Sequence, residues 1–356
     1  MRFGLTEEQR ELRDTVRDAL ADLCPPATVR AAWVEADADP ETTPRDTVRG
    51  LWPELAALGV FGVMIPEPAG GLGMGPVELT AILEQLGHAG VPGPVVETAF
   101  VGAPLLVASG GSGQDVLSGV LTGTTLLSAA FGREEPTPPS YAAHGADADL
   151  LWLPDADHLA LVPRHAARCV AQRSVDHTRG LARADWNGAG ALPGRVNPAQ
   201  RAAAFDRGAL GTAAMLFGIG RRLSDMTVEY ARVREQFGRP IGSFQAVQHH
   251  LADVAIALHF ARPLLYRAAW AVSVEHPRAD VAVSAAKLRC SVAAATVGRV
   301  ALQVHGAIGY TTECDLHLSL KRAWSLSAAW GDDAFHRARI GEAVLTHPNP
   351  EDLWDA

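Results

Sequence analysis

The chain has 356 residues, 48% hydrophobic and 20% charged, which is enough to bury one large core or several smaller ones. Its formal net charge of -9 argues against a nucleic-acid partner, because phosphate binding requires a basic surface. The cysteines are scattered, with neither a CxxC pair nor metal-ligand spacing, which predicts reduced thiols and no metal site: Cys24, Cys169, Cys290 and Cys314.

The apolar runs of the chain predict a cytoplasmic protein without a membrane segment. The N-terminal stretch is amphipathic and acidic, unlike a signal peptide. The best candidate for a membrane span, residues 202–222, contains Asp206 and Arg207, so we expect no membrane-spanning helix.

Residues 1–125 predict helices separated by loops. Thr6 is suited to cap the first helix, and Gln9 follows three residues later in the capping-box position. Apolar residues at helical spacing continue over 51–65 and 77–90, on either side of a Gly/Pro-rich loop. The GGLGMG run in that loop lacks the surrounding βαβ unit of a dinucleotide site, so we interpret it as a connection between helices.

Residues 126–197 predict a small β domain, because short apolar runs at 148–154 and 158–164 are bounded by Pro, Asp and Gly. Trp152 is expected in a strand core. From residue 198 onward, the pattern predicts an antiparallel four-helix bundle with helices at 198–233, 243–274, 278–305 and about 315–345. The predicted fold is therefore mainly α, with domains at 1–125, 126–197 and 198–356.

The stretch REQFGRPIGSFQAVQ, residues 234–248, places stacking and hydrogen-bonding side chains at a helix break. Arg234 offers a fixed fork of donors that suits a pyrophosphate. Phe237 and Phe244 are suited to pack on adenine or ribose, and Gln245 to bind a nucleotide edge. By itself, the stretch also fits an exposed arginine at a helix end, two core phenylalanines and a capping glutamine.

A second segment, QVHGAIGY at 303–310, combines the polar Gln303 with the small pair Gly306 and Ala307. Small residues at such a place let a ligand approach the backbone closely. This segment is the second candidate binding element.

With these segments the chain resembles the acyl-CoA dehydrogenase family, through residues 51–89, 232–253 and 302–323. The resemblance covers nearly the whole chain and implies a helical N-terminal domain, a middle β domain and a C-terminal four-helix bundle. It further implies that both candidate segments bind the ADP half of an FAD that belongs to the neighbouring subunit. The implied contact residues are Arg234, Gln236, Phe237, Phe244, Gln245, Gln303, His305, Gly306 and Ala307.

The β domain departs from the family pattern. The family's own-subunit flavin contacts include a Thr-Glu-Pro-x-x-Gly-Ser-Asp segment and a later Trp-Ile-Thr. This chain has SAAFGREEPTPPSY at 128–141, without Gly-Ser-Asp, and the second segment is absent.

The catalytic base of the family is missing too. Removal of the thioester α-proton requires a carboxylate, supplied in most members by a Glu before a Gly in the last part of the bundle. That position is Trp330, and the alternative position used by a minority of members is Gly208. Weak replacement candidates for the base are Asp332 and Asp206, with His305 and His336 weaker still.

The chain thus retains the residues for a partner's flavin and lacks those for its own. We expect the base-lacking smaller subunit of a heterotetrameric enzyme, which supports α,β-dehydrogenation of an acyl thioester by completing the FAD site of a glutamate-bearing partner. One alternative is a self-sufficient homodimer or homotetramer that acts on an acyl-CoA or acyl-carrier-protein thioester with another base. Another is reuse of the fold for hydration, oxygenation or scaffolding.

Overall fold

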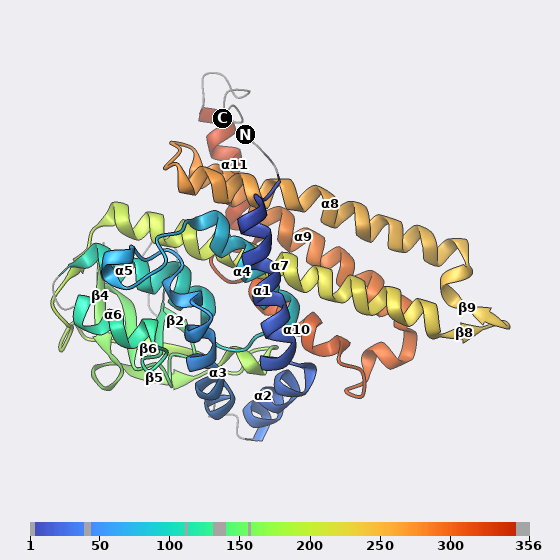
Figure 1. Ribbon diagram of the computed structural model, residues 1–356, viewed down its shortest axis with the longest axis horizontal. Coiled ribbons are helices and arrows are strands. Elements are labelled where there is room, and N and C mark those ends of the chain that lie inside the picture. The colour runs from blue at the N-terminus through green and yellow to red at the C-terminus, as the bar shows by residue number, and fades with distance from the viewer. Residues whose placement is uncertain (1–3, 39–43, 111–112, 131–139, 156–157, 347–356) are drawn as a thin grey trace.

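The computed structural model describes residues 4–38, 44–110, 113–130, 140–155 and 158–346. Helices occupy both ends of the chain and strands lie between them (Figure 1). The helices of the first part are α1 (Glu7–Leu23), α2 (Pro26–Ala38), α3 (Arg45–Ala57), α4 (Pro76–Ala89), α5 (Ala103–Ser109) and α6 (Gly113–Leu121). A π-helix, Val96–Gly102, leads directly into α5.

The capping box predicted for α1 is confirmed. The Thr6 hydroxyl accepts from the Gln9 amide at 3.2 Å, and the Gln9 side chain accepts from the Thr6 amide at 2.9 Å. The apolar run at 51–65 is not one helix, because α3 ends at Ala57 and Gly59 has a φ of 76°. A 3-10 turn, Val60–Gly62, follows it, and residues 70–75 form a loop as predicted.

In the described part of the chain between α6 and α7, the strands form two small sheets. The first has the order β1 (Leu127–Ala129), β3 (Leu150–Asp155), β4 (His158–Pro163) and β7 (Arg195–Val196). The second has the order β2 (Ser140–Ala143), β6 (Leu181–Asp185) and β5 (Arg168–Ala171). The strands predicted within 148–154 and 158–164 are observed as β3 and β4, which pair antiparallel, with Trp152 opposite Leu161. Trp152 is fully buried, as expected for a strand core residue.

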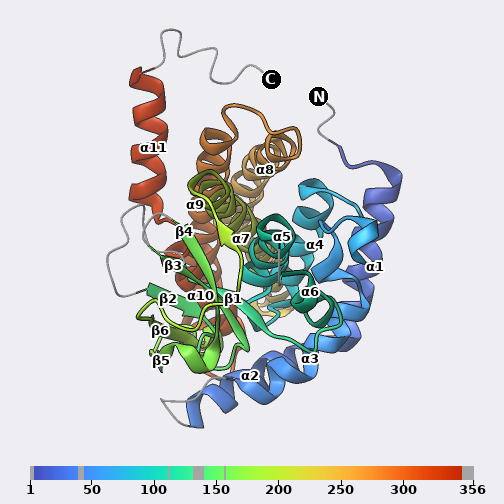
Figure 2. The same cartoon turned by 90° about the vertical axis from the view of Figure 1, so that its left-hand side faces the viewer.

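The C-terminal helices are α7 (Pro198–Val233), α8 (Gln245–Ser273), α9 (Ala279–His305), α10 (Leu316–Ser327) and α11 (Asp333–Thr346). The prediction of one helix over 315–345 is wrong, because the chain turns sharply between α10 and α11. Trp330 and Gly331 have φ values of 56° and 90°, which no right-handed helix accommodates. α11 therefore stands apart from α10 and packs along α9 (Figure 2).

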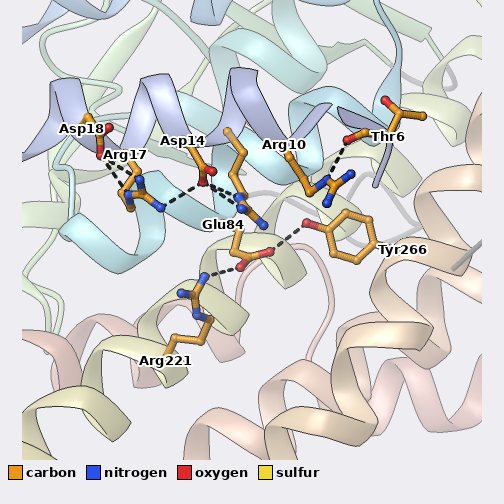
Figure 3. Close-up of polar contacts among 9 residues, drawn as sticks. Thr6, Arg10, Asp14, Arg17, Asp18, Glu84, Arg221 and Tyr266 are labelled. Atoms are coloured by element: carbon orange, nitrogen blue, oxygen red, sulfur yellow. Dashed lines mark hydrogen bonds and ion pairs between the residues drawn. The ribbon is translucent and has the colours of Figure 1, made fainter. Parts of the chain in front are cut away.

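Buried polar contacts join the first part of the chain to the bundle. Glu84 of α4 accepts from the Tyr266 hydroxyl of α8 at 2.8 Å and pairs with Arg221 of α7 (Figure 3). α4 also crosses α7 closely, since a β carbon on Gly218 would lie 2.0 Å from the Glu84 carbonyl oxygen. The two regions consequently share one continuous core.

One stretch of the described residues, Ala279–Tyr310, is long and apolar enough to span a membrane, contrary to the sequence expectation that no run would be. Of its most apolar 18-residue window, 67% is buried inside the protein. It is the central helix of the bundle, α9, with the turn that follows it.

Candidate functional site

The predicted nucleotide-binding stretch forms a protruding hairpin between α7 and α8. Its strands are β8 (Glu235–Gln236) and β9 (Arg239–Pro240), and the two residues between them, Phe237 and Gly238, have φ values of 54° and 78°. Positive φ at both central residues is characteristic of the tight hairpin turn that matches strand twist. Figure 1 shows this hairpin at one end of the molecule, and the two sheets formed by β1 to β7 at the opposite end.

The aromatic side chains of the hairpin lie at the surface. Phe237 is 93% exposed and Phe244 is half-buried, so the alternative of two core phenylalanines is wrong. The two rings meet edge-on, with centroids 6.1 Å apart. The Arg239 guanidinium lies 4.2 Å above the centre of the Phe244 ring, a contact that sequence reasoning missed. Arg234, Gln236 and Gln245 are also exposed.

The second predicted segment lies at the same end of the bundle. The buried His305 ring stacks on Tyr230, which is one helical turn before Arg234, with ring centroids 4.4 Å apart. Its Nδ1 hydrogen-bonds to the Ala301 carbonyl at 2.8 Å, and burial lowers the pKa of His305. His305 thus packs α9 against α7. Gln303 and Ala307 are exposed, and Gly306, at a φ of 62°, has open space where a β carbon would be.

The two expected base positions lie in direct contact. A β carbon on Gly208 would lie only 2.4 Å from the Trp330 ring. The indole therefore lies against the backbone of α7 at Gly208 and fills the space in which a side chain from that position would project. Phe205, one turn earlier on α7, packs edge-on at 6.1 Å between ring centroids.

Buried polar groups hold the turn that carries Trp330. The Lys287 ammonium donates to the carbonyls of Ser327 at 3.0 Å and Gly331 at 3.2 Å. Nε2 of His336 lies 3.0 Å from the Trp330 carbonyl oxygen, which makes it the donor to that oxygen. Burial lowers the pKa of Lys287 to about 8 and that of His336 to about 4. His336 is therefore neutral near neutral pH and structural rather than solvent-facing.

A carboxylate that sequence reasoning missed lies beside the indole. Glu97 is buried in the π-helix, and its Oε1 accepts from Trp330 Nε1 at 3.3 Å. The Arg179 guanidinium lies 3.4 Å from the same oxygen. The one signal in the sequence was a single acidic residue within the apolar run 94–107.

The aspartates considered as replacement bases are engaged elsewhere. Asp206 pairs with Arg339 of α11 at 2.5 Å, and its burial raises the pKa of the carboxyl group despite that pair. Oδ1 of Asp332 accepts from the Phe335 amide at 2.8 Å and so caps the start of α11. Both carboxylates therefore have structural partners.

The segment 128–141, which lacks the family's Gly-Ser-Asp, consists mainly of residues 131–139, and these lie outside the described residues. The remaining parts of the segment belong to β1 and β2. Trp152, which was predicted in a strand core, donates from Nε1 to the Gly102 carbonyl at 3.3 Å.

Two family models match the chain. The acyl-CoA dehydrogenase N-terminal domain matches residues 6–123, and the acyl-CoA dehydrogenase C-terminal domain matches residues 199–345. The chain belongs to the acyl-CoA dehydrogenase family. This confirms the resemblance and the predicted fold class, and it places the chain among FAD-dependent oxidoreductases.

Individual family members match most of the chain. Acyl-CoA dehydrogenase IpdE2 of Mycobacterium tuberculosis is 32% identical, over 89% of this chain and 91% of its own length. The crystal structure of the ChsE4-ChsE5 complex from the same organism has a chain that is 28% identical, with a TM-score of 0.86 over 98% of this chain and 100% of that chain. A Tcur3481-Tcur3483 steroid ACAD variant is 26% identical, with a TM-score of 0.79 over 94% and 97%.

Proposed function

We propose that this chain is the subunit without a catalytic base in a heteromeric acyl-CoA dehydrogenase, and that it completes the flavin site of a related partner subunit. The contact between Trp330 and Gly208 carries the proposal. Neither position bears a carboxylate, and the Trp330 indole fills the space into which a side chain at position 208 would project. Proton abstraction from the α carbon of a thioester requires a base within hydrogen-bonding reach. The carboxylate beside the contact, Glu97, is engaged by Trp330 and Arg179, so in this proposal the partner supplies the base.

The position of the hairpin supports a flavin shared between subunits. The hairpin and the β strands lie at opposite ends of this chain, so a flavin on the hairpin would meet the β strands of another subunit (Figure 1). The exposed Arg234 suits the pyrophosphate and the exposed Phe237 ring suits the adenine. When bound, FAD would supply the hydride acceptor for the dehydrogenation.

The nature of the partner and substrate follows from the family. An acyl-CoA or acyl-carrier-protein thioester is the substrate class, and the partner is a second family member with an intact Glu-Gly. The ChsE4-ChsE5 complex and the Tcur3481-Tcur3483 steroid enzyme are relatives whose names join two proteins, which supports a heteromer over a homodimer or homotetramer. A location in the cytoplasm stays a prediction.

The test compares the chain purified alone with the chain co-expressed with a second family member that carries an intact Glu-Gly. Alone, we expect a colourless protein without dehydrogenase activity. Together, we expect a yellow complex with one FAD for each pair of chains, whose colour bleaches when an acyl-CoA is added.

The opposite result would support the self-sufficient enzyme. Stoichiometric FAD on the chain alone, with bleaching by an acyl-CoA, would contradict the proposal. Oxygen consumption or hydration of an enoyl thioester without flavin reduction would instead indicate reuse of the fold.

A further inference from the structure

We propose that the slot over Gly208 is a preformed binding site for a planar N–H heteroaromatic group, which Trp330 fills as an internal ligand. The slot is defined by Gly208, Glu97, Arg179 and Phe205. The inference concerns this chain alone and does not depend on the flavin contacts proposed above.

The floor of the slot is the backbone of α7. The ring atoms Cδ2 and Cε3 of Trp330 would each lie 2.4 Å from a β carbon on Gly208, so the face of the indole rests on the helix where the side chain is missing. A helix surface without a β carbon is flat enough to receive an aromatic face. The glycine therefore creates the room that the indole occupies.

One wall of the slot supplies a specific hydrogen-bond acceptor. Oε1 of Glu97 lies 3.3 Å from the indole Nε1, and Arg179 lies 3.4 Å from the same oxygen. The side chains of this ion pair are only 8% and 11% exposed. Because Glu97 is held by Arg179 and by its own helix, its place does not require the indole.

The remaining wall is also independent of Trp330. Phe205 packs edge-on against Phe335, with ring centroids 5.3 Å apart, and Asp206 next to it pairs with Arg339 of α11 at 2.5 Å. These contacts fix the start of α7 relative to α11. We therefore expect the slot to persist when the Trp330 side chain is removed.

The chemistry of the slot specifies its ligand. A bicyclic aromatic ring fits between the glycine floor and the Phe205 edge, and a ring N–H satisfies the Glu97 carboxylate. Trp330 is half-buried rather than fully enclosed, so we expect a free ligand to reach the slot from solvent once the indole is removed. Cavities lined by apolar groups are known to take up small aromatic molecules.

The test uses the full chain in three forms: wild type, Trp330→Ala and Trp330→Phe. Indole and benzofuran are titrated into each protein, with binding measured by calorimetry and by the shift in Tm. Benzofuran has the same shape but carries an oxygen in place of the N–H. We expect Trp330→Ala to bind indole roughly ten-fold or more tightly than benzofuran, because a hydrogen bond to a charged group contributes that much. Wild type and Trp330→Phe should bind neither.

Several outcomes would overturn the proposal. A folded Trp330→Ala protein that does not bind indole would show that the slot collapses. Equal affinities for indole and benzofuran would show that Glu97 does not act as the acceptor. Indole binding by the wild type with the same affinity would place the ligand elsewhere. If Trp330→Ala does not fold alone, recovery of folded protein with indole but not with benzofuran supports the slot, and no recovery counts against it.

Discussion

The indole of Trp330 lies so close to the α carbon of Gly208 that a β carbon there would be 2.4 Å from the ring. The two residues belong to α7 and to the turn between α10 and α11, which are far apart in the sequence. Trp330 is therefore compatible with the fold only because position 208 carries no side chain.

The effect of Gly208→Ala on the free energy of unfolding should have opposite signs in the wild type and in a Trp330→Ala background. In the wild type, Gly208→Ala overpacks the contact, which we expect to lower the free energy of unfolding by about 1–3 kcal/mol. In a Trp330→Ala background the space beside Gly208 is open. Alanine is a better helix former than glycine, so Gly208→Ala should there raise the free energy of unfolding by up to about 1 kcal/mol. Urea denaturation of the four proteins measures this coupling.

Gly50 provides the control for that cycle. It lies in α3, and nothing lies within 4 Å of a β carbon there. Gly50→Ala should therefore have the same effect in both backgrounds. An equal effect of Gly208→Ala in the two backgrounds would contradict the contact.

Lys287 should make the stability of the turn depend on pH. Burial lowers its pKa to about 8 in the folded protein, against 10.5 in the unfolded chain. Between these values the unfolded chain binds more protons, so stability rises with pH and is lost as pH falls through 8. The free energy of unfolding of the wild type relative to Lys287→Met should rise by about 2 kcal/mol from about pH 8 to about pH 10.

Lys321 supplies the matched control for this measurement. Lys321 lies on α10, away from the turn, and its ammonium is 4.5 Å above the ring of Trp33 on α2. Lys321→Met removes the other lysine of the sequence and leaves the turn intact, so a pH-dependent change that appears in both variants does not come from the turn. A flat difference for Lys287→Met would show that the amine stays charged in the folded protein.

Arg234 should contribute to FAD affinity in the complex with a partner. Arg234→Met removes the charged donors proposed for the pyrophosphate, and we expect FAD to bind roughly ten-fold or more weakly. The melting temperature of the chain alone should not change, because the side chain is exposed. Arg232→Met, at another exposed arginine two residues earlier, is the control. Equal FAD affinities in the two variants would remove Arg234 from the site.

Tyr266 should stabilise the junction between the first helices and the bundle. Its hydroxyl donates to the buried Glu84 carboxylate at 2.8 Å, and burial followed by that carboxylate raises the pKa of the phenol (Figure 3). Tyr266→Phe leaves one carboxylate oxygen without this donor, which should cost about 1–3 kcal/mol in thermal or urea unfolding. Tyr310→Phe, at an 80% exposed tyrosine, should change stability by less than about 0.5 kcal/mol. Equal losses in both would contradict the role of the contact.

The sequence by itself determined the elements that depend on near neighbours. The Thr6 capping box, the strands around Trp152 and the long helices α7 and α9 follow from hydrogen bonds and apolar spacing within a few residues of each position. The family was visible for the same reason, since its motifs are contiguous. The boundaries at 125 and 197, and the flavin contacts, stay predictions.

The tertiary structure alone decided what surrounds Trp330. Its contact with Gly208, the acceptor Glu97 and the donor Lys287 come from three different parts of the chain. The left-handed backbone that splits 315–345 into two helices is stable only because those distant groups hold it. No local pattern encodes such contacts, because they arise when separate helices pack against one another.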